Sequence, residues 1–395
     1  MMLNMIRETW IRLQKSVLPA VFILAFFGIL EGIGYALCPA AMQGGGVTTT
    51  ANHIGWLIAR TASAVYDNRG FLFAVCVGYE LSGKTAEGAA AGLIGVLLFN
   101  SFSASPFFIE FWPAVLDSPV DTLALYGPNA CTGILFGIAG AAIITAVYKK
   151  THPIKALIAG LAVLPAMTIG LLGLRIVLFE LLVPAGNALV SLGPSGSGLY
   201  ASLNRLLAPF ELHRPLNYAV LSEFGAGDMA RYWAMMREGD PGRYMSGFFA
   251  PMMAGVPSAC LLMRRRCLKN GQNRRGVLFL LFAVSAFIAG LCEPFEYWLL
   301  LVSPIGYVLY VTVFGLCAWA SVCSGFRAGF ACSGGLVDFV FSSALPAASR
   351  SWLLLPLCIG ASLFFILLFS LIRPESRPES DIMEAADDAQ KGETI

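Results

Sequence analysis

Charged residues are scarce in this sequence. Only 13% of its 395 residues are Asp, Glu, Lys or Arg, whereas 57% are hydrophobic and the mean hydropathy is +0.73. Soluble globular proteins carry about 25% charged residues, and a membrane-spanning helix needs ~20 apolar ones. Charge is absent from residues 88–109, 122–148, 244–263, 297–326 and 351–372. This scarcity excludes a soluble enzyme or a nucleic-acid-binding domain, and it predicts an all-α polytopic protein in a lipid bilayer.

Motifs for nucleotides and metals are missing as well. There is no Walker A pattern and no GxGxxG after a strand, so a nucleotide-driven pump has no support. Most of the ten cysteines lie inside apolar runs, where cysteine behaves as a small buried hydrophobe. None has CxxC or Cys/His ligand spacing. We therefore expect no metal and no redox cofactor.

The net charge of +2 hides an asymmetry along the chain. Residues 374–395 hold seven acids and two bases, which leaves 24 bases against 17 acids in residues 1–373. Bases cluster near the N-terminus and in the 149–155 and 264–275 loops, and such clusters mark the cytoplasmic side. The acidic tail has too little apolar surface to pack, so we expect it to be disordered. The pattern predicts a multi-pass plasma-membrane protein with both termini in the cytoplasm and a retained first helix.

The pattern of apolar residues changes near residue 184. Ordinary spans are expected over 16–38, 54–66, 70–109 (as two segments or one broken one), 122–148 and 155–183. Residues 184–242 instead interleave apolar residues with Gly, Pro, Ser and charges, and a similar break follows near residue 293. Irregular backbone at membrane depth is tolerated where it is buried or lines a cavity, and interrupted helices indicate a transporter binding site. We predict a scaffold half (1–183), a substrate-binding half (184–372) with re-entrant hairpins, and a tail (373–395).

Two carboxylates stand out at the second break. Glu293 and Glu296 flank Pro294 between two apolar segments, and an intramembrane charge costs roughly 2.5–3.5 kcal/mol. In a helix they would share one face, while the proline would bend the backbone at Glu293. This arrangement suits the binding of sugar hydroxyls or a proton relay. An interfacial pair facing lipid headgroups is the structural alternative.

A histidine lies in the first irregular stretch. His213 is placed between two prolines in APFELHRPLN, with Arg205 and Arg214 near it. A histidine among cations is able to hold a phosphate or polarise a hydroxyl. A simple packing role is the alternative.

Five segments, in order, resemble one known family. They are NRGFLFAVCVGYELSGKTAEGAAAGLIGVLLFN (68–100), GLYASLNRLLAPFELHRPLN (198–217), GRYMSGFFAPMMAGVPSACLLM (242–263), FIAGLCEPFEYWLLLVSPIGYVLY (287–310) and GFACSGGLVDFVF (329–341). Together they resemble the membrane subunit, enzyme IIC, of the glucose superfamily of bacterial sugar phosphotransferase systems. That family includes glucose, N-acetylglucosamine, maltose and glucoside types.

The resemblance implies a fold and a mechanism. It implies about ten transmembrane helices with two re-entrant hairpins, a homodimeric scaffold, and an elevator-like movement of the substrate domain. A phosphocysteine on a IIB protein would phosphorylate the translocated sugar. The family's sugar-contacting Glu, His and Arg fall on Glu293, His213 and Arg205, and a carboxylate near the 6-hydroxyl would orient or deprotonate it.

Further substrate-binding candidates are Glu296, Asn68 and Asp338. Asn68 and Asp338 would serve equally well as helix caps.

Departures from the family pattern leave a rival function open. Arg214 replaces the family's second His, and Cys292 replaces the Thr before the Glu. No IIB domain is recognisable, so we expect a separate phosphorylated IIB protein as partner. A sugar-binding membrane sensor or an uncoupled facilitator that has lost phosphoryl transfer is the alternative. The sequence does not identify the sugar, because specificity depends on a few pocket contacts worth ~1–3 kcal/mol each.

Overall fold

The computed structural model describes residues 2–43, 49–103, 127–149, 153–222, 225–236 and 238–373. These residues form helices and connecting turns with one isolated β-bridge, between Arg327 and Ser349, and no β-strand. The helices of the N-terminal part are α1 (Met2–Leu37), α2 (Thr50–Asp67), α3 (Arg69–Leu81), α4 (Ala86–Phe102), α6 (Ala130–Lys149) and α7 (Pro153–Ser191). The C-terminal part contains α8 (Gly193–Leu207), α9 (His213–Leu221), α10 (Asp228–Trp233), α11 (Ser246–Ala250), α12 (Val256–Lys269), α13 (Asn273–Ala289), α14 (Glu293–Val302), α15 (Pro304–Cys323), α16 (Leu336–Ser342) and α17 (Leu354–Ile372).

Membrane-length helices confirm the predicted all-α membrane protein. Six segments among the described residues are long and apolar enough to cross a bilayer: Arg7–Leu37, Ala130–Tyr148, Pro153–Ser191, Ser246–Lys269, Pro304–Cys323 and Ser351–Ile372. The helix Ala86–Phe102 is apolar but shorter. The predicted tail lies outside the described residues, except for Arg373.

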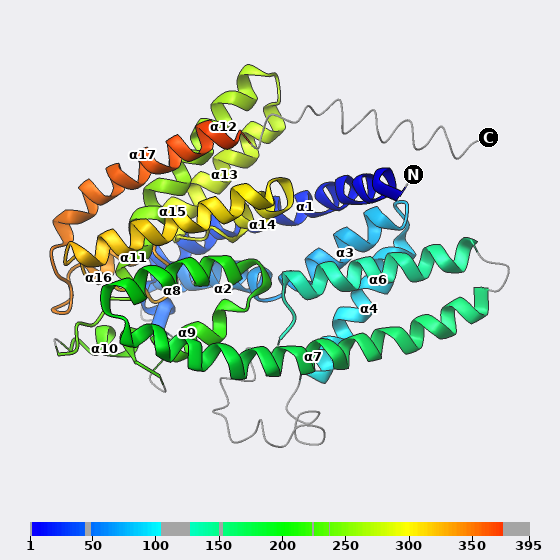
Figure 1. Cartoon of the computed structure of the whole chain (residues 1–395), viewed down its shortest axis with the longest axis horizontal. Helices are drawn as coiled ribbons and strands as arrows, with labels where there is room; N and C mark the ends of the chain where they lie inside the picture. Colours follow the sequence, from blue (N-terminus) through cyan, green and yellow to red (C-terminus); the bar gives the residue numbers. More distant parts are fainter. Residues whose placement is uncertain are drawn as a thin grey trace.

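Helices α3, α4, α6 and α7 form a bundle with a small core of its own (Figure 1). That core consists of Ala74, Val96, Phe99, Phe136, Leu164 and Leu172. Small residues let the backbones approach closely, as is common between membrane helices. A Cβ on Gly140, for example, would lie 2.4 Å from the backbone nitrogen of Gly92. Within the apolar region expected over 70–109, the described residues up to 103 form two helices, α3 and α4, joined by a turn.

The larger core joins α1 to the C-terminal helices. Helix α8 packs along α15, α12 packs along α13, and α1 packs against both α2 and α13 (Figure 1). Helices α11 and α12 belong to one continuous helical segment, whose middle turn, Pro251–Gly255, is π-helical. Helix α7 runs through Pro184 to Ser191, so the predicted boundary between the halves falls inside a helix.

Breaks in the helices come where the sequence predicted irregular backbone. Residues 193–221 form α8 and α9 with a short 3-10 turn, Ala208–Phe210, between them, and Glu211 has a left-handed φ of +55°. Gly290 caps the C-terminus of α13 with a φ of +72°. A Cβ there would lie 2.6 Å from the nitrogen of Gly335, so only glycine fits. The start of α14 is thereby held against the loop that precedes α16.

Candidate functional site

Arg205 and Glu296 form a buried ion pair between α8 and α14. Nη1 of Arg205 lies 3.4 Å from Oε1 of Glu296, with the arginine 5% exposed and the glutamate fully buried. The hydroxyl of Tyr310 donates to the same carboxylate oxygen over 2.7 Å. The pair neutralises two charges that would each be costly to bury alone.

Aromatic rings and amides fix the position of the Arg205 guanidinium. Its central carbon lies 5.6 Å from the ring centroid of Phe248 and 5.9 Å from that of Phe314, in cation–π range. Its Nε and Nη2 donate to Asn204 Oδ1 over 3.1 and 2.6 Å. The Asn204 amide in turn donates to Asn217 Oδ1 over 2.6 Å. The cation is therefore held in one orientation by α8, α9, α11 and α15.

Glu293 and Glu296 occupy the first turn of α14. A helix N-terminus favours negative charge. Pro294, at the second position, has no backbone N–H, but the N–H groups of the first turn have no partner within the helix in any case. Oε2 of Glu293 and Oε2 of Glu296 are both buried, and neither has a hydrogen-bond partner among the described residues. Both carboxylates therefore offer an acceptor to a ligand.

His213 begins α9 and faces a cluster of arginines. Burial of the ring, followed by the positive charges of Arg205, Arg214 and Arg69, holds the pKa of His213 well below its usual range. The imidazole is therefore neutral at physiological pH. Its Nδ1 is buried and unpartnered within the described residues, which leaves it available to a hydroxyl.

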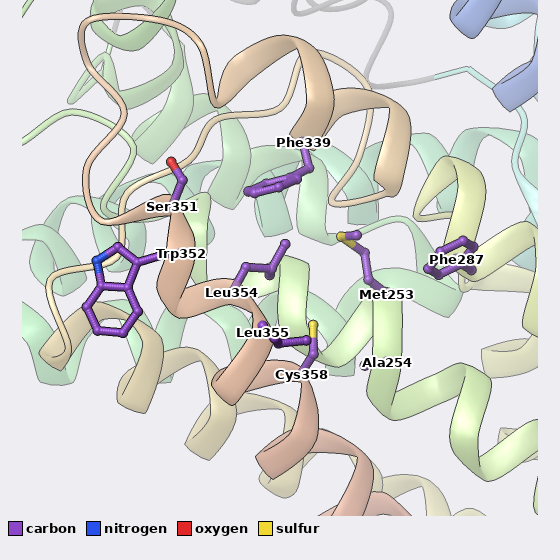
Figure 2. A pocket seen from close by; sticks show the side chains of 9 residues that line it. All are labelled: Met253, Ala254, Phe287, Phe339, Ser351, Trp352, Leu354, Leu355 and Cys358. Atoms are coloured by element: carbon purple, nitrogen blue, oxygen red, sulfur yellow. The ribbon is translucent and has the colours of Figure 1, made fainter.

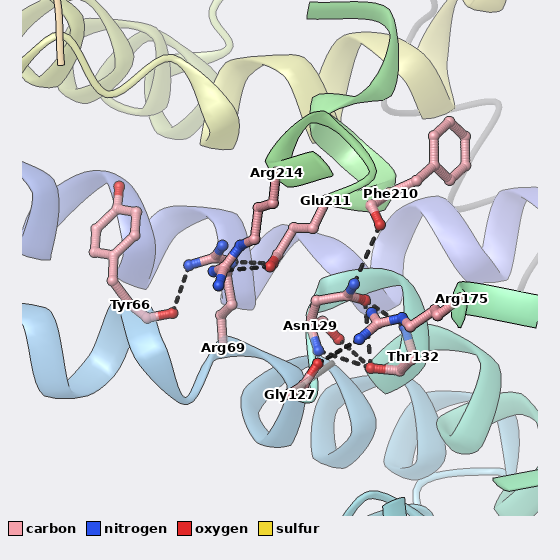
Figure 3. Close-up of polar contacts among 9 residues, drawn as sticks. All are labelled: Tyr66, Arg69, Gly127, Asn129, Thr132, Arg175, Phe210, Glu211 and Arg214. Atoms are coloured by element: carbon pink, nitrogen blue, oxygen red, sulfur yellow. Dashed lines mark hydrogen bonds and ion pairs between the residues drawn. The ribbon is translucent and has the colours of Figure 1, made fainter. Parts of the chain in front are cut away.

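Glu211 connects α3 to the α8–α9 turn. Arg69 Nε donates to Glu211 Oε1 over 2.5 Å, and Arg214 Nη2 lies 3.1 Å from Oε2, so both arginines converge on one carboxylate (Figure 3). Arg69 also donates to the carbonyl of Tyr66 over 2.7 Å. Sequence analysis did not select Arg69 or Glu211. The available signal was their position in the same two family-like segments as Asn68 and His213.

Asn129, just before α6, joins the bundle of α3, α4, α6 and α7 to the α8–α9 turn. Asn129 donates from its amide to the carbonyl of Phe210 over 3.1 Å, and Arg175 of α7 donates to the carbonyl of Gly127 over 2.5 Å (Figure 3). The turn that carries Glu211 is therefore fastened to both α3 and α6.

Asn68 and Asp338 have local backbone partners. The Asn68 amide donates to the carbonyl of Ala64 at the end of α2. Asp338 accepts backbone N–H bonds from Ala331, Cys332 and Ser333 over 2.6 to 3.3 Å. In this conformation both side chains bind nearby backbone groups, in line with the capping alternative. The other four candidates lie around one site: Arg205, His213, Glu293 and Glu296.

Five buried polar atoms of this region have no hydrogen-bond partner among the described residues. They are Tyr66 Oη, His213 Nδ1, Glu293 Oε2, Glu296 Oε2 and Tyr297 Oη. The charge of Glu293 acts on both tyrosine hydroxyls, and the charge of Arg205 acts on His213 and Glu296. Buried polar atoms in proteins are nearly always hydrogen-bonded, so a cluster of exceptions calls for a partner. A ligand with several hydroxyl groups would satisfy it.

An apolar pocket elsewhere is unsuited to such a ligand. It has a volume of about 570 Å³ and lies between the π-helical turn Pro251–Gly255, α13, α16 and the start of α17 (Figure 2). Eight of its nine lining residues are hydrophobic, and Ser351 is the exception. Its walls therefore offer almost nothing to sugar hydroxyls.

Comparison with known proteins identifies the family. Residues 14–315 match the profile of the family described as "Phosphotransferase system, EIIC". The chain belongs to this family. Arg205, His213, Glu293 and Glu296 all lie within the matched residues, whereas Asp338 lies beyond them.

Curated relatives of this EIIC chain carry N-acetylglucosamine in their names. It is 28% identical over 340 residues to the "PTS system N-acetylglucosamine-specific EIICBA component" of Escherichia coli (strain K12), covering 80% of this chain. The Klebsiella pneumoniae protein of the same name is 29% identical over 340 residues, also covering 80% of this chain. The EIICB component of Bacillus subtilis (strain 168) is 28% identical over 350 residues, which cover 84% of this chain and 74% of the relative. The EIIC chain spans about half (49%) of the two EIICBA relatives.

Proposed function

We propose that this chain is the membrane permease component of a phosphoenolpyruvate-dependent sugar phosphotransferase system. It binds a glucose-type sugar and translocates it for phosphorylation by a phosphorylated IIB component. The cluster of unpartnered polar atoms around the Arg205–Glu296 pair carries the proposal, because it lies within the family-matched residues and fits a polyhydroxylated ligand. The relatives' names make N-acetylglucosamine the first sugar to test.

The residues would divide the work of binding and orientation. Arg205 and Glu296 fix each other, which leaves Glu296 Oε2 as an acceptor for a sugar hydroxyl. Glu293 accepts from the hydroxyl that is to be phosphorylated and orients or deprotonates it, and neutral His213 accepts a second hydroxyl. Charged hydrogen bonds of this kind contribute about 1.5–3 kcal/mol each.

The finer architecture is part of the same proposal. We expect about ten spans with two re-entrant hairpins in the bacterial plasma membrane, with both termini in the cytoplasm. The chain would act as a homodimer whose substrate half moves against its scaffold half. Two core clusters support a division into parts, since α3, α4, α6 and α7 share a separate core. The relatives' designations EIICB and EIICBA name a B component together with C, which supports a IIB partner for this chain.

A reconstituted phosphorylation assay tests the proposal. Vesicles that contain the chain receive the general phosphotransferase proteins, a phosphorylated IIB component and labelled N-acetylglucosamine or other glucosides. We expect phosphorylated sugar only when IIB is present, and strong loss in Glu293→Gln. Glu238→Gln, at an exposed position, is the matched control. Sugar that binds or equilibrates without ever being phosphorylated would contradict coupled transport and favour the sensor or facilitator.

A further inference from the structure

Glu31 is a buried carboxylate that the proposed function does not use. It lies in the membrane-spanning segment Arg7–Leu37 of α1 and is 6% exposed. Its Oε1 accepts hydrogen bonds from the hydroxyls of Tyr35 over 3.1 Å and Ser63 over 3.0 Å. Within the described residues, Glu31 takes part in no ion pair. The carboxyl group of Glu31 therefore lies in the apolar part of α1 with hydrogen bonds from two hydroxyls and, in the part of the chain that the structure describes, no cationic partner.

The charges that act on Glu31 are negative. They come from Glu293 at the start of α14 and from Asp67 at the end of α2. The other titratable groups of this region are Tyr35 on α1, Tyr66 on α2 and Cys332 in the loop before α16. Glu211 and Glu296 each have an arginine partner, whereas Glu31, Glu293 and Asp67 take part in none of the ion pairs among the described residues.

Close packing on both sides of Glu31 restricts what could neutralise it. A Cβ on Gly28 would lie 2.4 Å from Ser285 Oγ, and one on Gly32 would lie 2.6 Å from Ile288 Cγ2. The backbone of α1 therefore touches α13 one turn before Glu31 and directly after it. Such packing favours the smallest neutralising ligand, a proton, over a hydrated cation or a sugar amine.

We propose that Glu31 is a proton-binding site at the contact between α1 of the scaffold half and the helices of the substrate half. Its bound proton lets Glu31 lie near Glu293 without repulsion between two ionised carboxylates in a medium of low dielectric. Loss of the proton creates that repulsion and opposes the ionised form of Glu293, which accepts the sugar hydroxyl. This last step rests on the proposed function, while proton binding itself does not.

Infrared spectroscopy tests proton binding without any sugar. The full chain in lipid vesicles is titrated with pH while the C=O stretch of protonated carboxyl groups is recorded. We expect Glu31→Gln to lose part of this band at neutral pH, whereas the exposed control Glu8→Gln retains it. Should Glu31→Gln not fold, Glu31→Asp is expected to shift the band. An unchanged band in the folded variant would overturn the proposal.

Binding of N-acetylglucosamine tests the link to Glu293. In the wild type we expect affinity to fall at least about fivefold as pH rises through the titration of Glu31, which is the lower end of typical coupling between sites. Glu31→Gln should keep the low-pH affinity throughout. An equal pH dependence in both proteins would refute the link. If the wild type binds no sugar, the proposed function fails and the infrared result alone decides the proton site.

Discussion

Arg205 and Glu296 lie 91 positions apart in the sequence and form an ion pair in which both side chains are at most 6% exposed. The pair ties α8, from the first irregular stretch, to α14, from the second. Each carboxylate or guanidinium in such a pair depends on the other, because a buried charge without a partner is costly.

Removing the charge of Glu296 should destabilise the fold. Glu296→Gln leaves the Arg205 guanidinium buried without its carboxylate, which costs about 3–5 kcal/mol. Thermal unfolding of the purified protein in detergent measures the loss. The exposed control Glu238→Gln should melt like the wild type. A Glu296→Gln midpoint equal to the wild-type value would show that the pair does not support the fold.

Removing the hydroxyls of Tyr66 and Tyr297 should affect ligand binding rather than folding. Both hydroxyls are buried without partners among the described residues, so Tyr66→Phe and Tyr297→Phe should unfold at or above the wild-type temperature. Each should weaken sugar binding by about 0.5–1.5 kcal/mol, the net worth of one hydrogen bond.

Tyr310→Phe is the contrasting variant for Tyr66→Phe and Tyr297→Phe. Its hydroxyl donates to Glu296, so its loss should lower stability even without sugar. Melting curves with and without N-acetylglucosamine separate the two effects. Equal sugar-induced shifts in all three variants and the wild type would argue against a ligand role for Tyr66 and Tyr297.

His213 should make stability depend on pH in a defined direction. Its pKa in the folded protein lies well below the ordinary 6.5, so the unfolded chain binds more protons there. The free energy of unfolding is therefore unaffected by the titration of His213 above pH 6.5, and it falls as the pH drops from 6.5 towards the folded pKa of His213. His213→Gln should flatten this part of the curve of melting temperature against pH. His53→Gln, at an exposed histidine whose Nδ1 lies 2.8 Å from the carbonyl oxygen of Thr49, is the matched control. A wild-type slope in His213→Gln would contradict a buried neutral imidazole.

Asp338 should control the order of the loop before α16. Asp338→Asn reduces the charge that holds three backbone N–H groups of residues 331–333, and bonds to a charged group contribute about 1.5–3 kcal/mol each. We expect faster amide hydrogen exchange in residues 329–336. Exchange in the α3–α4–α6 bundle serves as the internal control. If Asp338 contacts sugar instead, the variant should lose affinity while exchange in the loop stays unchanged.

Much of the site was predictable because its residues break a rule of membrane sequences. Glu293, Glu296, Arg205 and His213 are polar groups in apolar or interrupted segments, and the structure brings them together. Glu31 broke the same rule. The sequence does not connect it to the site, because its neighbours Ser63 and Glu293 are distant in the chain.

The sequence by itself determined that this protein is helical, lies in a membrane and belongs to the EIIC family. Long uncharged runs and the order of five segments carry that information locally, because a helix in lipid satisfies its own backbone. Tertiary structure alone decided that Glu211 pairs with both Arg69 and Arg214 and that Asp338 holds a loop. It also decided that the hydroxyls of Tyr66 and Tyr297 have no hydrogen-bond partner among the described residues. Arg69 and Glu211 are 142 positions apart. Which charges meet across such a separation depends on helix packing, and no local pattern of residues encodes it.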